Sequence, residues 1–169
     1  GQEGQEYWLA MELAGQFASA NHLIIHTRIA KAVGLKPIAT VENHHNFAWR
    51  ERLPAPAGFT SGDREVIVHR KGATPAGKDV LGVIPGSMAD PGYLVRGKGV
   101  IEALNSASHG AGRAMSRRAA RQNITRTERD RYLKARGITL LSAGLDESPQ
   151  AYKPIQSIIA AQSDLIEVI

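Results

Sequence analysis

Hydrophobic positions recur along the chain with two different periods, which predict where helices and strands lie. Between residues 7 and 33 apolar side chains recur every three or four positions, so we expect a helix that stops at Gly34. The apolar face of this helix comprises Leu9, Leu13, Phe17, Ala20 and Ile24. Residues 64–69, 80–84 and 93–95 form short alternating or apolar runs bounded by glycine and proline, which is typical of strands. Residues 40–48 predict a short strand or the loop at a strand end, and a Pro/Gly-rich turn follows at residues 53–62.

The second half of the chain predicts shorter elements. Residues 125–128 read Thr-Arg-Thr-Glu, a capping box that should start a helix reaching Arg136 and ending at Gly137. Residues 138–142 are a candidate buried strand, and residues 164–169 alternate like another strand. Ser148 and Pro149 fit a helix N-cap and first helical position, and a helix restarts at Pro154 with its isoleucines facing inward. These isoleucines are Ile155, Ile158 and Ile159.

The order of these elements predicts an α+β fold: a mixed β-sheet, glycine-rich loops gathered at strand ends, and flanking helices. With 169 residues, of which 43% are hydrophobic, the chain is long enough for one domain with its own core. Both ends look cut, since a helical pattern begins almost at once and a strand-like run closes the chain. We therefore expect a piece of a larger protein.

Charge and cysteine content narrow the setting. A net charge of +5 favours a polyanionic partner, and the arginines crowd between residues 113 and 136. The absence of cysteine excludes disulfides and thiolate metal sites and is typical of a reducing compartment. No apolar run reaches membrane-spanning length and no secretory signal precedes the first helix, so we expect a cytoplasmic protein.

The strongest candidate for chemistry is the stretch at residues 107–113, Ala-Ser-His-Gly-Ala-Gly-Arg. Glycines allow close approach of a bulky group to the backbone, and arginine forks grip phosphate oxygens in pairs. We expect a helix to open directly after His109, carrying Arg113, Arg117 and Arg118, with its positive end toward an anion. His109 would then be placed to attack a phosphorus atom.

Other polar residues stand at predicted strand ends. His44 and His45 should point to opposite faces, so at most one of them would serve a metal site. Lys71 ends a strand within a basic, glycine-containing turn, and Ser87 occupies a tight loop; both positions favour an anion. Tyr152 lies at a helix break, either as a ligand contact or as a half-buried structural tyrosine.

The histidines of the first helix have two interpretations. His22 and His26 have the i to i+4 spacing of a metal pair, but a surface or hydrogen-bonded role fits such helix histidines better.

Together these motifs resemble the RtcB family of RNA-splicing ligases, in the family's order and over most of the chain. The matching strings are His45-Asn46, Val68-His69-Arg70-Lys71-Gly72-Ala73-Thr74, Pro85-Gly86-Ser87-Met88, Ser108-His109-Gly110-Ala111-Gly112-Arg113 with Ser116-Arg117, and Glu147-Ser148-Pro149 with Ala151-Tyr152-Lys153. The resemblance implies a partial RtcB-like fold, in which residues 1–169 are the C-terminal portion of a single catalytic domain without its N-terminal part and extreme C-terminus. It also implies a GTP- and manganese-dependent ligase. Such an enzyme joins an RNA 3′-phosphate or 2′,3′-cyclic phosphate end to a 5′-hydroxyl end in tRNA splicing or RNA repair.

The resemblance also implies roles for single residues. His109 matches the nucleophile that becomes guanylylated, and His45 matches a manganese ligand. Arg113 and Arg117 match arginines that hold phosphates of the nucleotide or of the RNA ends, and Lys71 matches a lysine in the RNA-end site. The guanylate pocket is expected at Ser87, Ala111, Gly112, Arg113 and Tyr152.

Departures from the family pattern leave alternatives open. The family's other metal ligands (an Asp, a Cys and two His), its guanine-binding acidic residue and its closing lysine-glycine have no match here. Gly92 stands where a second serine is frequent, which indicates a divergent branch. We expect the fragment alone to be inactive, because one histidine does not hold two metals. The alternative is a non-catalytic RNA- or nucleotide-binding module; a phosphoesterase using His45 and His109 would need Asp90 or Glu42 as further ligands.

Overall fold

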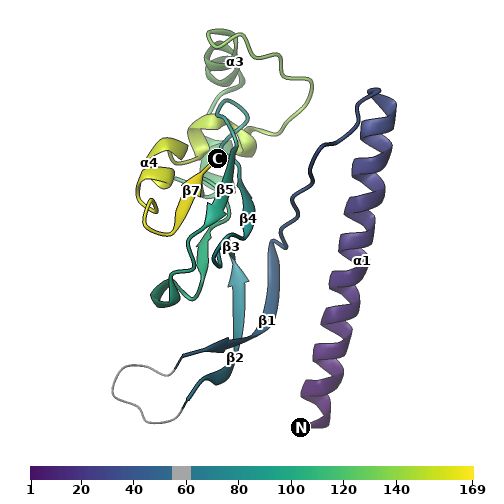
Figure 1. Cartoon of the computed structure of the whole chain (residues 1–169). Helices are drawn as coiled ribbons and strands as arrows, with labels where there is room; N and C mark the ends of the chain where they lie inside the picture. The colour runs from purple at the N-terminus through teal and green to yellow at the C-terminus, as the bar shows by residue number, and fades with distance from the viewer. Residues whose placement is uncertain (55–61) are drawn as a thin grey trace. The chain divides into compact units, whose positions relative to one another are not determined.

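The computed structural model describes residues 1–54 and 62–169 and divides into two compact units, Gly1–Lys71 and Gly72–Ile169 (Figure 1). The helices are α1 (Gln2–Ala32), α2 (Arg117–Asn123), α3 (Arg126–Lys134) and α4 (Ile155–Ala160), with 3-10 turns η1 (Ile101–Ala103), η2 (Leu145–Glu147) and η3 (Pro149–Ala151). The strands are β1 (Asn46–Leu53), β2 (Arg64–Lys71), β3 (Ala73–Pro75), β4 (Leu81–Ile84), β5 (Tyr93–Gly97), β6 (Ser106–Ser108) and β7 (Ile166–Val168). No helix in the described part of the chain is long and apolar enough to cross a membrane.

The first unit begins with the predicted long helix, α1. It starts earlier than the periodicity indicates, at Gln2, and stops before Gly34, whose φ of 69° suits glycine. The large side chains of its predicted apolar face remain exposed, from 49% for Ile24 to 75% for Phe17, and Gly15 is the one buried residue of this helix. A Cβ at Gly15 would lie 2.5 Å from the ring of Phe47, so this glycine allows the aromatic ring to reach the helix backbone.

Strands β1 and β2 form an antiparallel hairpin in which Asn46 lies opposite Lys71. Residues 40–45 form no strand, which confirms the interpretation of this segment as a loop before a strand. The hairpin contains a buried cation, Arg70, which is 2% exposed and donates to both carboxylate oxygens of Glu51 at 2.6 and 3.1 Å. The predicted turn at residues 53–62 lies almost wholly outside the described residues.

The second unit confirms the α+β class, but its strands do not pair as the mixed sheet that the sequence predicts. Strand β3 pairs with β6, and β4, β5 and β7 form a three-stranded sheet; all pairs among the described strands are antiparallel, where a mixed sheet is expected. Strands β4 and β5 are joined by a short hairpin connection over residues 85–92, whereas residues 76–105 separate β3 from β6 and residues 98–165 separate β5 from β7. The core of this unit contains Ile84, Val95, Ile155, Ile166 and three alanines, with Ile158 and Ile159 packed against it as predicted.

Two predicted elements are wrong. Residues 138–142 form no strand, and Leu141 is 95% exposed, because these apolar residues have no neighbouring strand to pair with. The helix expected directly after His109 begins only at Arg117, where the Ser116 hydroxyl caps it by accepting from the Ala119 N–H at 3.1 Å.

The capping box is confirmed, whereas the helix predicted from residue 148 is shorter than expected. The Thr125 hydroxyl accepts from the Glu128 N–H at 3.2 Å, and the Glu128 carboxylate accepts from the Thr125 N–H at 2.9 Å. The helix expected from Ser148 is the single 3-10 turn η3, and Ser148 makes no capping bond through its side chain.

Candidate functional site

His109 is placed at the end of a strand rather than at the start of a helix. Antiparallel pairing sets Ser108, the last residue of β6, opposite Ala73, so that His109 follows beside Gly72. The His109 N–H donates to the Gly72 carbonyl at 3.3 Å, and a Cβ added at Gly72 would lie 3.8 Å from Nε2 of the imidazole. Gly72 has a φ of 76°, so the strand can turn there and leave the ring against a bare backbone.

A buried glutamine fixes the residue before His109. Gln162, 6% exposed, accepts from the Ser108 N–H at 2.9 Å and donates to the Ser108 hydroxyl at 2.8 Å. Both ends of its amide are therefore used on one residue of β6. Sequence reasoning missed Gln162, because the 54 positions that separate it from Ser108 leave no local signal.

The glycine-rich loop after His109 contacts two other loops. The Ala111 N–H donates to the Pro85 carbonyl at 3.0 Å, and the Gly112 carbonyl accepts from the Lys153 N–H at 3.0 Å. Ala111 is 3% exposed, and Gly112 has a φ of 69°. The loop is thus bonded on one side to the turn before Ser87 and on the other to the segment carrying Tyr152.

Ser87 is engaged within its own turn. Its hydroxyl donates to the Asp90 carboxylate at 2.5 Å and accepts from the Ala89 N–H at 3.2 Å. Asp90 therefore orients Ser87, and one of its carboxylate oxygens is engaged within this turn. A ligand that meets Ser87 in this arrangement finds an acceptor, since the hydroxyl proton is already directed to Asp90.

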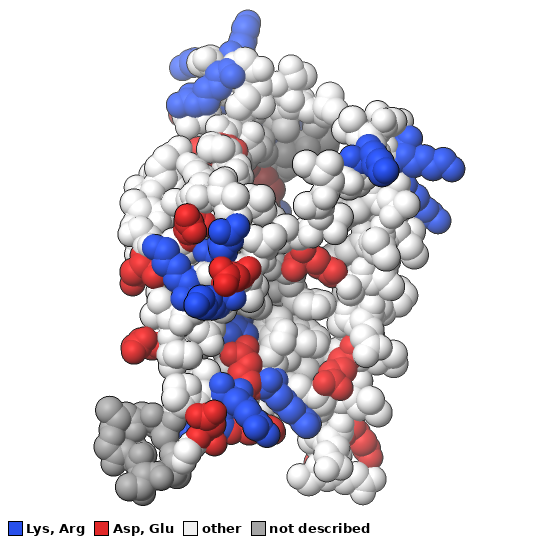
Figure 2. Space-filling view, in the orientation of Figure 1, with Lys and Arg blue, Asp and Glu red and all other residues white. Residues whose placement is uncertain are grey.

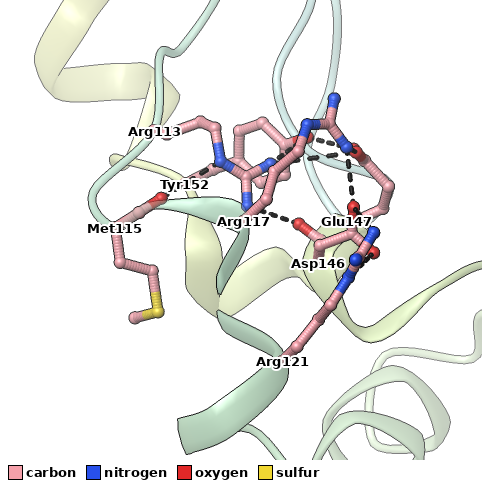
Figure 3. A network of polar contacts seen from close by, with 7 residues as sticks. All are labelled: Arg113, Met115, Arg117, Arg121, Asp146, Glu147 and Tyr152. Carbon is pink, nitrogen blue, oxygen red and sulfur yellow. Dashed lines mark hydrogen bonds and ion pairs between the residues drawn. The ribbon is translucent and has the colours of Figure 1, made fainter. Parts of the chain in front are cut away.

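Arg113 and Tyr152 lie together in a polar network (Figure 3). Their backbones form an isolated antiparallel bridge, and Nη1 of Arg113 donates to the Tyr152 hydroxyl at 3.2 Å. The guanidinium lies 5.0 Å from the centre of the tyrosine ring. The other guanidinium nitrogens donate to the carbonyls of Met115 at 3.1 Å and Asp146 at 2.5 Å, so the direction of the fork is fixed.

Asp146 gathers two further arginines (Figure 3). Its carboxylate accepts from Arg117 at 2.7 Å and from Nε and Nη2 of Arg121, both at 3.2 Å. These hydrogen bonds, that of Arg121 first, lower the pKa of Asp146 to about 2 from its ordinary 3.8. The hydrogen bond to Asp146, followed by that to Glu147, raises the pKa of Arg117. Sequence reasoning missed Asp146, which lies directly before the Glu147-Ser148-Pro149 string and is not part of a matching motif.

Glu147 completes the network. It accepts short hydrogen bonds from the Tyr152 hydroxyl and from Arg117, and it lies 3.8 Å from Nη1 of Arg113. The hydrogen bond from Tyr152, followed by that from Arg117, lowers the pKa of Glu147. Burial and the neighbouring Glu147 raise the pKa of Tyr152. Glu147 therefore ties the predicted nucleotide contact Tyr152 to the predicted RNA contact Arg117.

The network has a chemical consequence. Three arginines meet two carboxylates, which leaves an excess of positive charge, and the side chains of Arg117 and Arg121 are 62% and 65% exposed. Exposed guanidinium groups can leave a carboxylate for a phosphate at low cost. The arrangement suits an anion that competes with Asp146 and Glu147 for the guanidinium groups of these arginines.

The remaining site residues belong to the first unit. His45 is exposed and directly precedes β1, and Lys71 ends β2. The neighbouring His44 stacks on Phe47 with ring centres 4.7 Å apart, so the two adjacent histidines have different surroundings. The described residues contain no group of three or more His, Asp or Glu side chains able to hold a metal ion. The residues present therefore do not complete a manganese site.

The first helix uses its histidine in a structural contact. His22 Nδ1 lies 3.0 Å from a carboxylate oxygen of Glu42, whose other oxygen accepts from the Ser19 hydroxyl at 2.8 Å. The hydrogen bond from Ser19 is the largest cause that lowers the pKa of Glu42. This contact favours the hydrogen-bonded interpretation of His22 over a metal pair with His26, and it engages the second carboxylate proposed for a phosphoesterase.

Comparison with known proteins gives one consistent result. All of residues 1–169 match the family model described as tRNA-splicing ligase RtcB. The chain is 35% identical over 182 aligned residues to the RNA-splicing ligase RtcB of Escherichia coli (strain K12). This alignment covers 99% of the chain and 43% of the E. coli protein. The chain is 32% identical to the tRNA-splicing ligase RtcB of Thermococcus kodakarensis and 32% identical to the RNA-splicing ligase RtcB of Mycobacterium bovis, over 94% of this chain in both cases. The chain spans less than half the length of these relatives.

Proposed function

Because the chain belongs to the RtcB family, we propose that it carries the nucleophile and part of the guanylate pocket of a GTP-dependent RNA ligase. The substrates in this proposal are an RNA 3′-phosphate or 2′,3′-cyclic phosphate end and a 5′-hydroxyl end. The observation that carries it is the placement of His109. The imidazole follows a strand fixed by Gln162 and opens into the Ala111–Gly112 loop, which is itself bonded to the Tyr152 segment.

In the first step a nitrogen of His109 attacks the α-phosphorus of GTP. A phosphorus–nitrogen bond forms, the bond from the α-phosphorus to the bridging oxygen breaks, and pyrophosphate leaves. A neutral imidazole suits this step, because it is nucleophilic and its adduct is a good leaving group afterwards. Arg113 would hold phosphate oxygens, since its fork is already directed by two carbonyls and by Tyr152.

The next two steps transfer and release the guanylyl group. An oxygen of the RNA 3′-phosphate attacks the same phosphorus and breaks its bond to His109, which gives an activated RNA end. A cyclic phosphate end must first be hydrolysed to the 3′-phosphate. The 5′-hydroxyl then attacks the RNA 3′-phosphorus and expels GMP, while its proton passes to solvent. Arg117 and Lys71 are the proposed contacts to the RNA ends.

Manganese enters the proposal only as the ion that His45 is expected to bind. Divalent ions supply charge neutralisation of the triphosphate in chemistry of this kind. Because the described residues complete no metal site, no step is assigned to the ion.

The ligation assay tests this function. The complete gene product is incubated with GTP, manganese and two RNA strands, one ending in a 3′-phosphate and the other beginning with a 5′-hydroxyl. Denaturing gels should show a joined strand that depends on GTP and disappears in His109→Ala. A joined product that forms equally without GTP would contradict the proposal.

A second candidate, a non-catalytic RNA- or nucleotide-binding module, has support of its own. Arg117 is paired with Asp146 and Glu147, and Ser87 is engaged with Asp90, so both side chains have partners within the chain. This candidate predicts RNA binding without any covalent GMP adduct. Detection of a GMP adduct on His109 therefore distinguishes the ligase from the binding module.

A further inference from the structure

Positive charge gathers on α2 and α3 far beyond what the proposed site uses. Eight basic and two acidic residues lie between Arg117 and Arg136, a net charge of +6, whereas the whole chain carries +5. All other residues together are therefore close to neutral. A surface that carries the excess charge of an entire chain is the place where a polyanion would be attracted first.

The two acidic residues of this segment are hydrogen-bonded to residues close by in sequence. Glu128 is held by the N–H and hydroxyl of Thr125, and Asp130 accepts from its neighbour Arg129 at 2.8 Å. At the other end of the segment, Arg117 and Arg121 are paired with Asp146. These contacts account for three of the eight cations.

The other five cations point to solvent: Arg118, Arg126, Arg131, Lys134 and Arg136 are all exposed. None of these five forms an ion pair with a carboxylate anywhere in residues 1–54 and 62–169. Figure 2 shows Lys and Arg side chains standing out at the top of the molecule, over α3. We call these five residues the α2–α3 basic surface.

The helix that carries most of this surface is well anchored. Its N-terminus is closed by the capping box, Leu133 is 2% exposed, and Arg129 is 8% exposed and donates to the Ala143 carbonyl at 3.1 Å. Cations on a fixed helix lose less freedom on binding than cations on a loose tail. Charge and order thus coincide in α3.

The spacing of the exposed cations fits a chain of phosphates. Arg126, Arg131 and Lys134 fall within about 140° of one another around the helix, and Arg126 and Lys134 are about 12 Å apart along its axis. Beyond the helix end, the Arg136 guanidinium stacks 3.5 Å from the centre of the Tyr132 ring. A guanidinium and an aromatic ring are the groups on which unpaired bases stack.

We propose that the α2–α3 basic surface binds the sugar-phosphate backbone of the single-stranded RNA whose end enters the site. The inference rests on the proposed function for the identity of the polyanion. Continuity supports it: Arg117, the proposed contact to the RNA end, is the first residue of α2, and only Ile124 and Thr125 separate α2 from α3. RNA held at Arg117 would therefore continue onto cations of the same unit.

The test compares charge removal at two places in the complete gene product. Arg126, Arg131 and Lys134 are changed together to Gln in one variant; in a matched control Arg28, Lys31 and Lys36, exposed cations of the first unit, are changed to Gln. Binding of a fluorescein-labelled oligouridylate is followed by anisotropy over a series of KCl concentrations. The α3 variant should bind about tenfold more weakly, with a salt slope smaller by about 2.

The control variant should keep the wild-type affinity and slope, as should a variant in which Arg126 and Arg131 become Lys. Unchanged affinity and slope in the α3 variant would overturn the inference, and so would an equal loss in the control. Labelling of His109 by GTP, which needs no RNA, should be the same in all variants. A GMP adduct with unaltered RNA binding would reject the surface alone, whereas α3-dependent RNA binding without any adduct would reject the proposed ligase function alone.

Discussion

Arg113 and Tyr152, 39 positions apart, are joined by a backbone bridge, by a hydrogen bond of 3.2 Å from guanidinium to hydroxyl and by the guanidinium 5.0 Å from the tyrosine ring. The resemblance places both residues at the same nucleotide pocket. Their direct contact in the second unit supports that assignment, because one guanylate could then meet both side chains. Glu147 adds a carboxylate that holds the tyrosine hydroxyl and lies near the arginine.

This pairing predicts the effect of Tyr152→Phe. The phenylalanine keeps the ring against Arg113 but removes the hydroxyl that Arg113 donates to and that Glu147 accepts from. We expect a loss of about 1 kcal/mol in the free energy of unfolding and a weaker binding of GTP. Urea unfolding and equilibrium dialysis measure the two effects. Tyr7→Phe, at a residue 72% exposed, should change neither, and identical behaviour of the two variants would contradict the assigned contact.

Gln162 is predicted to act as a positioning residue for His109. Gln162→Met keeps the volume but removes both hydrogen bonds to Ser108, so the strand end that presents the imidazole should loosen. We expect the rate of guanylylation to fall about tenfold with little change in the KM for GTP. Ser108→Ala, which loses one of the two bonds, should have a smaller effect.

The control for this prediction is Gln156→Met, at an exposed residue of α4. It should keep the wild-type rate. A rise in KM with an unchanged rate in Gln162→Met would show that the glutamine serves binding and not the position of the nucleophile.

Asp146 predicts a specific pH dependence of stability. Its pKa is lowered to about 2 in the folded chain from 3.8, so the stabilisation by Arg121 and Arg117 is complete above about pH 4 and is lost as the pH falls toward 2. Asp146→Asn lacks it at every pH. The difference in Tm between wild type and variant should therefore be constant above about pH 4, shrink as the pH falls through 2, and vanish only below that pH.

Thermal unfolding followed by circular dichroism at a series of pH values checks this. Asp164→Asn, at an exposed residue in the same unit, serves as the control and should show no such window. A difference for Asp146→Asn that persists unchanged at pH 2 would contradict the ion pairs assigned to Asp146.

Local patterns of the chain predicted its local structure. The alternation at residues 64–69 and the capping box at residues 125–128 involve neighbours in sequence, and both are confirmed. The strand at residues 138–142 failed because an apolar run also needs a partner strand, which the pattern does not reveal. The contacts of Asp146 with Arg117 and Arg121 span 29 and 25 positions, so no local signal marks them.

The roles of the site residues follow a similar division. Arg113, Arg117 and Tyr152 were predicted from motifs and do meet in one network. Their carboxylate partners and Gln162 were not, because a motif names the residues of a site without the side chains that orient them. The roles of all the site residues, those of the second unit as well as His45 and Lys71 of the first, stay predictions.

Residues 138–142, which were predicted to form a buried strand, can be compared with the true core through one apolar residue of each. Ile84 is fully buried in the core of the second unit, whereas Leu141 is 95% exposed. Ile84→Ala should lower the free energy of unfolding by about 3 kcal/mol, and Leu141→Ala should change it by less than about 0.5 kcal/mol. Urea unfolding measures both values, and a comparable loss in the two variants would restore the buried strand at residues 138–142.

The covalent adduct on His109 tests the central claim most directly. The complete gene product is incubated with manganese and GTP labelled at the α-phosphate, and the protein is then denatured and exposed to acid or alkali. We predict a label that acid removes and alkali does not, present in wild type and in the control His26→Ala and absent in His109→Ala. Label of the same acid lability that survives in His109→Ala would contradict the assignment of His109 as the nucleophile.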